Sequence, residues 1–271
     1  MNPDFRDRIS TAVWAVAILL AASALVSLPG RGANILVGDR TIALPFAASN
    51  LLPILLALAA GAGTQAVIQA HPLHRQGRLR LLIRFWALPM AVTLIASLLL
   101  PRAPSILYWA VLLIAMAGVL SIVLYALYFS LDWGGPGYRR ARTTLNLVGY
   151  GVAMALFLLL PTGWPAFGRA LTLGGVAMLL ALELLRGTQA SGSLVALYAF
   201  VVGAVITQVS WGLLLTGLPA ISASVLLLLM FYLLIGLTRQ TLFGRINRRV
   251  ALEYVTVGVL GVLLVLLLSP R

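Results

Sequence analysis

Nine long apolar runs occupy most of this 271-residue chain, and their length restricts the folds that it can adopt. About 20 apolar residues in a helix cross the hydrocarbon core of a bilayer. In lipid, only helices and closed barrels bond all of their backbone groups. The runs are rich in Leu, Ala and Val and lack the in-out alternation of barrel strands. The sequence therefore predicts an all-α integral membrane protein, a polytopic bundle of about nine transmembrane helices.

Turn signals made of Gly and Pro separate these runs. The predicted spans are residues 10–28, 45–69, 81–100, 106–131, 144–160, 165–185, 194–217, 220–238 and 250–268. The break at Gly217-Leu218-Pro219 requires a very tight hairpin between the seventh and eighth spans. Only 9% of the residues are charged, against about 25% in a typical soluble domain. Lipid is therefore the expected solvent for most of the chain.

Arginine is concentrated in every second gap between the runs, and this pattern predicts the orientation of the chain. Lys and Arg accumulate in cytoplasmic loops, and all 19 cationic residues here are arginines. The side that holds the N-terminus carries 14 of them, and the other side carries Arg31, Arg40, Arg102, Arg169 and Arg271. An error of one span would move the downstream arginines to the opposite side and remove most of the bias. The N-terminus is therefore predicted to be cytoplasmic and the C-terminus to lie outside.

No internal repeat divides the chain, so residues 1–271 are predicted to form a single transmembrane helical domain. The first outer gap contains two short apolar segments on either side of Gly38-Asp39. This pattern favours a β-hairpin. A small extracytoplasmic hairpin is therefore predicted at residues 34–44, where it could cap the bundle or insert at the interface.

The chain lacks the residues that several classes of membrane enzyme and pigment protein need. It has no Cys for thiolate chemistry and no Lys for a retinal Schiff base. Its two histidines, His71 and His74, lie in the second gap, so no span offers an imidazole for haem or as a base. The six carboxylates are scattered, whereas a metal site for lipid chemistry needs them clustered. No catalytic residue, metal site or cofactor is predicted, which favours a non-enzyme.

The net charge of +13 does not by itself predict nucleic-acid binding. The arginines are spread through short loops, without the aromatic and basic surface that single strands need. Contact with anionic lipid head groups on the cytoplasmic side accounts for them better. The candidate lipid contacts are Arg139, Arg140, Arg239, Arg245, Arg248 and Arg249. The last four lie in a segment that mixes basic and apolar residues, and an ordinary cytoplasmic loop is the alternative.

Polar side chains inside the predicted spans give a second set of candidates. Glu183 lies about one turn from the cytoplasmic end of the sixth span, and an ionisable residue in a span marks a functional hypothesis. Arg186 follows three residues later, so a Glu–Arg pair at the membrane edge is the structural alternative. Asn146, Thr207 and Gln208 are residue types that usually bond across helices. With Glu183 they form the candidate intramembrane polar site, and helix packing is the alternative.

Three functions of different classes fit this sequence. A structural or accessory subunit that interacts with lipid, and with other membrane subunits, fits the scarcity of reactive groups best. A transporter or flippase for a small or lipidic substrate predicts a polar cavity near Gln208, Asn146 and Glu183. A lipid-modifying enzyme predicts a groove at one membrane face where Asp39 or Asp132 lies beside arginines. The expected location is a bacterial-type inner (plasma) membrane.

Overall fold

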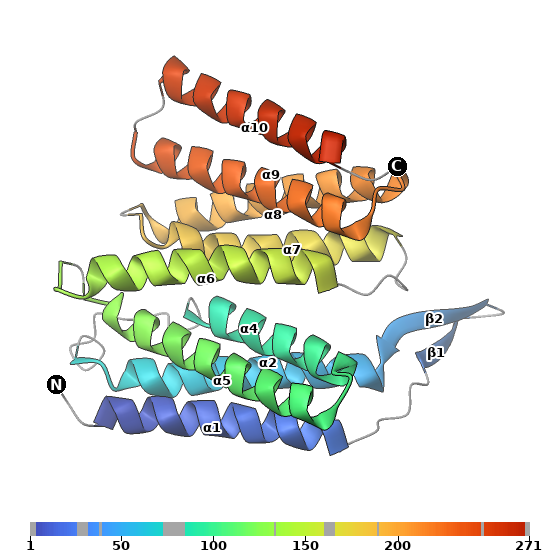
Figure 1. Cartoon of the computed structure of the whole chain (residues 1–271), viewed down its shortest axis with the longest axis vertical. Helices are drawn as coiled ribbons and strands as arrows, with labels where there is room; N and C mark the ends of the chain where they lie inside the picture. Colours follow the sequence, from blue (N-terminus) through green and yellow to red (C-terminus); the bar gives the residue numbers. More distant parts are fainter. Residues whose placement is uncertain are drawn as a thin grey trace. The chain divides into compact units, whose positions relative to one another are not determined.

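The computed structural model describes residues 4–25, 32–37, 40–72, 85–132, 134–159, 166–188, 190–244 and 247–268, which are mostly helical (Figure 1). The long helices are α1 (Asp4–Leu25), α2 (Ala48–Gln69), α4 (Ala87–Leu99), α5 (Ile106–Phe129), α6 (Tyr138–Leu159), α7 (Ala166–Leu185), α8 (Gly192–Leu215), α9 (Ala220–Leu242) and α10 (Arg248–Leu268). A short 3-10 helix, η2 (Leu100–Arg102), follows α4, and the strands β1 (Gly32–Val37) and β2 (Arg40–Ala47) precede α2.

Six helices are long and apolar enough to cross a membrane, as judged over the residues that the structure describes. They are α2 from Leu52 onward, α5, α6, α7, α8 and α9. Residues Ala87–Arg102 and Leu252–Leu263 form shorter apolar helices. A helix bonds its own backbone, which is what a segment in lipid requires. These apolar helices indicate a membrane-embedded helical protein.

Each predicted span contains a helix, although residues 45–47 of the second span belong to β2. Several helices also continue past their apolar run into charged sequence. α1 begins at Asp4 instead of residue 10, α6 begins at Tyr138 instead of residue 144, and α9 continues from residue 238 to Leu242. Hydropathy detects the part of a helix that lies in lipid, whereas caps and breakers set where the helix ends. The extensions therefore place Arg6, Arg139, Arg140 and Arg239 on helices, beyond the ends of the predicted spans.

α8 and α9 are joined by the tight turn that the sequence predicts. α8 ends at Leu215, and α9 begins directly after Pro219. Between them Gly217 has a φ of 67°, a conformation that glycine adopts without the steric penalty of a Cβ. Because proline lacks a backbone N–H, it is suited to the start of the second helix. The two helices pack against each other, so the break at residues 217–219 is a helical hairpin.

The contacts divide the chain into two compact units, Met1–Thr144 and Leu145–Arg271, and a single domain over residues 1–271 stays a prediction. In the first unit, α1 packs on α2 and α5, and α2 packs on α4 (Figure 1). The ring of Phe5 on α1 stacks on Tyr128 of α5 with centroids 4.6 Å apart. His71, just after α2, meets the same tyrosine ring at 4.7 Å. The start of α1 therefore lies beside the ends of α2 and α5.

The two strands form an antiparallel hairpin in the first unit, at the place where the sequence predicts one for residues 34–44. Asn34 pairs with Ala43 and Val37 pairs with Arg40. The strands extend a few residues beyond the predicted segment at both ends, and the two turn residues after Val37 lie outside the described residues. The position of this hairpin on the outer side of the membrane stays a prediction.

The second unit is built around a close contact between α7 and α8. A Cβ on Gly174 would lie 2.6 Å from the carbonyl oxygen of Gly203, and a Cβ on Gly203 would lie 2.8 Å from that of Gly174. Small residues allow two helix backbones to approach in this way. The side chain of Thr207 also occupies the space beside Gly174. α9 packs on α8 and α7, and α10 packs on α9, which completes the unit.

Gly174→Ala should force α7 and α8 apart and destabilise the second unit by about 1–3 kcal/mol, as overpacking does. Gly175 provides a matched control, because a Cβ at that position meets no atom within 4 Å. Ala is favoured over Gly in a helix interior by about 1 kcal/mol, so Gly175→Ala should be neutral or stabilising. Thermal unfolding of the purified variants tests this, and equal melting temperatures would contradict the close contact.

Candidate functional site

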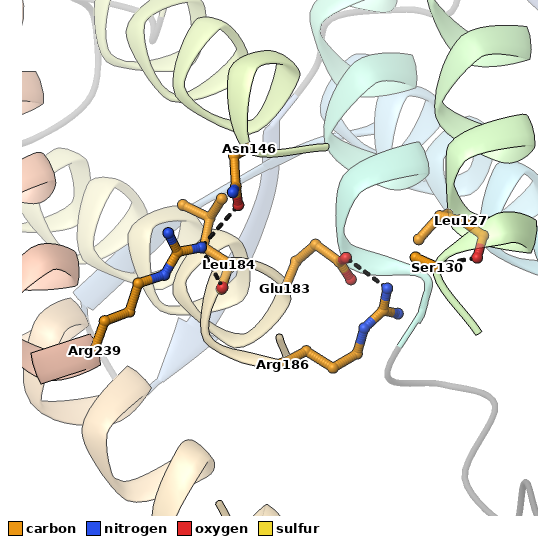
Figure 2. A network of polar contacts seen from close by, with 7 residues as sticks. All are labelled: Leu127, Ser130, Asn146, Glu183, Leu184, Arg186 and Arg239. Carbon is orange, nitrogen blue, oxygen red and sulfur yellow. Dashed lines mark hydrogen bonds and ion pairs between the residues drawn. The ribbon is translucent and has the colours of Figure 1, made fainter. Parts of the chain in front are cut away.

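Arg239, in the last turn of α9, connects three helices of the second unit through one guanidinium nitrogen (Figure 2). Its Nη2 donates to Oδ1 of Asn146 on α6 and to the carbonyl oxygen of Leu184 on α7, both at 2.8 Å. Carbonyls in the last turn of a helix need partners from outside that helix. A cation there is also stabilised by the helix dipole. Arg239 therefore caps α7 and links α6 to α9.

Glu183, one residue before Leu184, forms an ion pair with Arg186 on the same helix face (Figure 2). Nη2 of Arg186 lies 2.9 Å from Oε1 of Glu183. Only 1% of the Glu183 side chain is exposed, against 17% for Arg186, so the arginine extends from the buried carboxylate toward the surface. This is the ion pair that the sequence offers as the structural alternative for Glu183. Asn146, Glu183, Arg186 and Arg239, with the Leu184 carbonyl, are called the Arg239 cluster below.

Close packing surrounds the Arg239 cluster on α6. One turn beyond Asn146, the ring of Tyr150 lies 6.1 Å from that of Phe231 and 5.6 Å from that of Tyr232, both on α9. Aromatic rings attract each other at such separations. A Cβ on Gly149 would lie 3.0 Å from Cδ2 of Leu184, so the Leu184 side chain of α7 packs against α6. The cluster therefore lies in a packed helix interface.

Thr207 and Gln208 do not join the other two members of the predicted polar site. Thr207 lies on α8 against Gly174, and its hydroxyl donates to the carbonyl of Gly203 at 2.9 Å. Gly174 and Glu183 are separated by about 13 Å along α7 at 1.5 Å per residue. Gln208 is exposed on the surface of α8. The structure thus brings together Asn146 and Glu183 and leaves Thr207 and Gln208 apart from them.

The six predicted lipid-contacting arginines also divide into groups. Arg139 and Arg140 are exposed at the start of α6, and Arg248 is exposed at the start of α10. Arg239, in contrast, makes the two hydrogen bonds described above. It reaches the end of α7 because α9 continues as a helix beyond the predicted span. Arg245 and the side chain of Arg249 lie outside the part of the chain that the structure describes.

The first unit carries a groove that no signal in the sequence marks. It has a volume of about 1050 Å³ and is lined by α1, α5, the turn after α5 and the start of α6. Most of its walls are apolar, and Arg6 and Arg140 also line it. No carboxylate is among its described lining residues. Hydropathy predicts where the spans lie along the chain, but it does not predict which face of each helix packs against the neighbouring helices. The groove therefore cannot be predicted from the apolar runs.

The titratable residues outside the helices include one buried histidine, His71. Burial lowers the pKa of its imidazole below the ordinary 6.5, and the nearby carboxylate of Asp132 opposes that shift. Asp132 is exposed and does not line the groove, while His74 and Asp39 lie outside the described residues. Within the described ranges, no three His, Cys, Asp or Glu side chains lie close enough together to hold a metal ion.

A double-mutant cycle between Arg239 and Asn146 should show strong coupling. Arg239→Met removes a charge-assisted hydrogen bond, and such bonds contribute about 1.5–3 kcal/mol. Asn146→Leu removes the acceptor of the same bond. The double variant should therefore lose less free energy of unfolding than the sum of the losses in the two single variants. Unfolding of the purified proteins in micelles measures the four free energies, with Arg248→Met as an exposed-arginine control. Additive effects within about 0.5 kcal/mol would show that the bond contributes nothing.

No curated protein and no solved structure matches the chain. A family model described as "Protein of unknown function (DUF5656)" matches residues 29–268, which include the whole second unit except its last three residues and most of the first unit. The chain therefore belongs to the DUF5656 family.

Proposed function

We propose that this protein is a multi-pass, lipid-interacting accessory protein of a bacterial-type plasma membrane. The observation that carries the proposal is the groove of the first unit, which is mainly apolar and has arginines among its lining residues. A membrane lipid is complementary to such a groove, because its apolar acyl chains fit the apolar walls and its polar head group fits the arginines. The same protein could use this surface to associate with other membrane subunits through bound lipid.

The Arg239 cluster supports an accessory role over transport. A transporter of polar substrates needs polar groups that line a cavity. Here Asn146 and the Leu184 carbonyl accept hydrogen bonds from Arg239, and Glu183 is paired with Arg186. Gln208 is exposed and far along the helices from this cluster. Each of these groups has a partner within the protein, and the bonds of Arg239 join three helices, which favours a role in holding the helices together.

The carboxylates support a non-enzymatic role in the same way. A general acid or base must lie within hydrogen-bond reach of the reacting group. The groove has no described carboxylate in its lining, and Asp132 lies exposed in the loop after α5. A lipid held in this groove would therefore meet arginines and apolar side chains, which bind but do not supply a base at neutral pH.

The proposed topology has nine spans, with the N-terminus cytoplasmic and the C-terminus outside. In the first unit, Phe5, His71 and Tyr128 meet at one end. In the second unit, Asn146, Leu184 and Arg239 meet at one end. All members of each set lie in gaps or at span ends that are assigned to the cytoplasmic side. If the spans alternate in direction, such residues must lie at the same end of their unit, as they do here.

Single cysteines test this topology, since the natural chain has none. Pro104→Cys lies at an exposed position between η2 and α5, and Thr216→Cys lies at an exposed position between α8 and α9, both on the side proposed to be outside. Ser191→Cys and Phe243→Cys are their matched counterparts at exposed positions in cytoplasmic gaps. A membrane-impermeant maleimide should label the first pair in intact cells and the second pair only after permeabilisation. Labelling of Ser191→Cys or Phe243→Cys in intact cells would overturn the proposed arrangement.

Lipid retention tests the proposed function. The full-length protein, extracted from membranes in a mild mimic and purified, should keep phospholipid at about one molecule per chain through exchange into lipid-free detergent. A groove that contacts both the acyl chain and the head group should slow the exchange of the lipid into detergent micelles. Mass spectrometry of the purified protein counts the retained lipid. A folded protein that emerges free of phospholipid would contradict the lipid-interacting role.

A further inference from the structure

We propose that the groove of the first unit binds one anionic glycerophospholipid, with its phosphate between Arg6 and Arg140 and an acyl chain along α1 and α5. This inference rests on the lipid-interacting function proposed above and names the class of lipid. Four properties of the groove support it: the state of its two arginines, its length, the side of the membrane to which the arginines are assigned, and its small-residue wall.

The two arginines are suited to bind a phosphate group. Arg6 is on the first turn of α1 and Arg140 is on the first turn of α6, and both side chains are exposed. Within the described part of the chain, neither guanidinium takes part in an ion pair or a side-chain hydrogen bond, in contrast to Arg239. Guanidinium groups bind phosphate oxygens with paired, charge-assisted hydrogen bonds. With no described carboxylate in the lining, nothing there repels an anion.

The length of the groove matches one leaflet of a bilayer. Its lining runs along α1 from Arg6 to Ala17, about 17 Å at 1.5 Å per residue. Half of the hydrocarbon core is about 15 Å deep. α5 runs beside α1, with Tyr125 near the Arg6 end and Leu113 near the Ala17 end. An acyl chain could therefore follow both helices while its head group stays at the level of the arginines.

The side to which the arginines are assigned also favours an anionic lipid. Both lie in segments proposed to be cytoplasmic, and the cytoplasmic leaflet carries anionic phospholipid that attracts basic residues. A zwitterionic lipid would fill the apolar part equally well, but its cationic group would lie near the two guanidinium groups. The preference should therefore arise at the head group and not along the acyl chain.

Small residues leave room for the acyl chain on the α5 wall. Ala117 and Gly118 line the groove, and a Cβ added to Gly118 would meet no atom within 4 Å. A larger side chain at this position can therefore enter the groove without displacing the protein's own packing. Gly118→Leu should block the acyl chain and leave the helix intact, which makes it a direct probe of occupancy.

The first experiment tests the head group by native mass spectrometry of the full-length protein, titrated with phosphatidylglycerol or phosphatidylcholine. We expect phosphatidylglycerol to bind more tightly, and Arg6→Gln and Arg140→Gln each to weaken its binding about tenfold, the effect of losing one charge-assisted contact. Arg139→Gln is the matched control, because Arg139 is exposed on the same turn but does not line the groove. Equal weakening by all three substitutions, or equal affinity for the two lipids, would overturn the phosphate site.

The second experiment tests the groove itself. Gly118→Leu should reduce the binding of both lipids by tenfold or more, whereas Gly151→Leu on α6 should leave it unchanged, since a Cβ there also meets no atom within 4 Å. Circular dichroism and melting temperature establish that both variants are folded. Lipid retained by the wild type but unaffected by Gly118→Leu would overturn this inference and leave the lipid-interacting function standing. Loss of a protein partner or of self-association on Gly118→Leu, without loss of lipid, would assign the groove to that partner.

Discussion

The hydrogen bonds of the Arg239 guanidinium are the polar contact that links α6, α7 and α9 in the second unit. A polar group that is buried in a helix interface must be bonded within the fold. Arg239 meets this requirement for Asn146 on one helix and for the last turn of α7 on another. Because one nitrogen serves both acceptors at 2.8 Å, the relative positions of α6, α7 and α9 are restricted at that end.

Hydroxyl side chains meet the same requirement without crossing to another helix. Thr64, Thr93, Thr207 and Ser224 each donate to the carbonyl oxygen four residues earlier in their own helix, at 2.7–3.0 Å. Such local bonds compete with bonds across helices. Thr207 bonds in this way, and its position beside Gly174 separates it from the polar cluster. Asn146 has a longer amide side chain, and it accepts a bond from a neighbouring helix instead.

The sequence predicts the helices well because the length and polarity of each run follow directly from what lipid requires. The turn at Gly217 and Pro219 is equally local, since a positive φ and a missing N–H depend on those residues alone. The partners of Arg239 and the groove between α1 and α5 could not be predicted in this way. They depend on how each helix is rotated about its axis, and α5 is apolar on all sides, so its sequence does not distinguish a groove face from a packed face.

The arginine pattern has the same limit, because it reports the side of the membrane but not what each guanidinium contacts. Arg239 and Arg140 are both assigned to the cytoplasmic side and both lie on helices that extend beyond the apolar run. Arg239 meets an amide and a helix end that accept its hydrogen bonds. Arg140 lies at a mainly apolar groove that has no carboxylate among its described lining residues. An arginine on the cytoplasmic side can therefore orient the chain, hold helices together or remain available for an anionic ligand. Which of these roles it has depends on the side chains of the neighbouring helices.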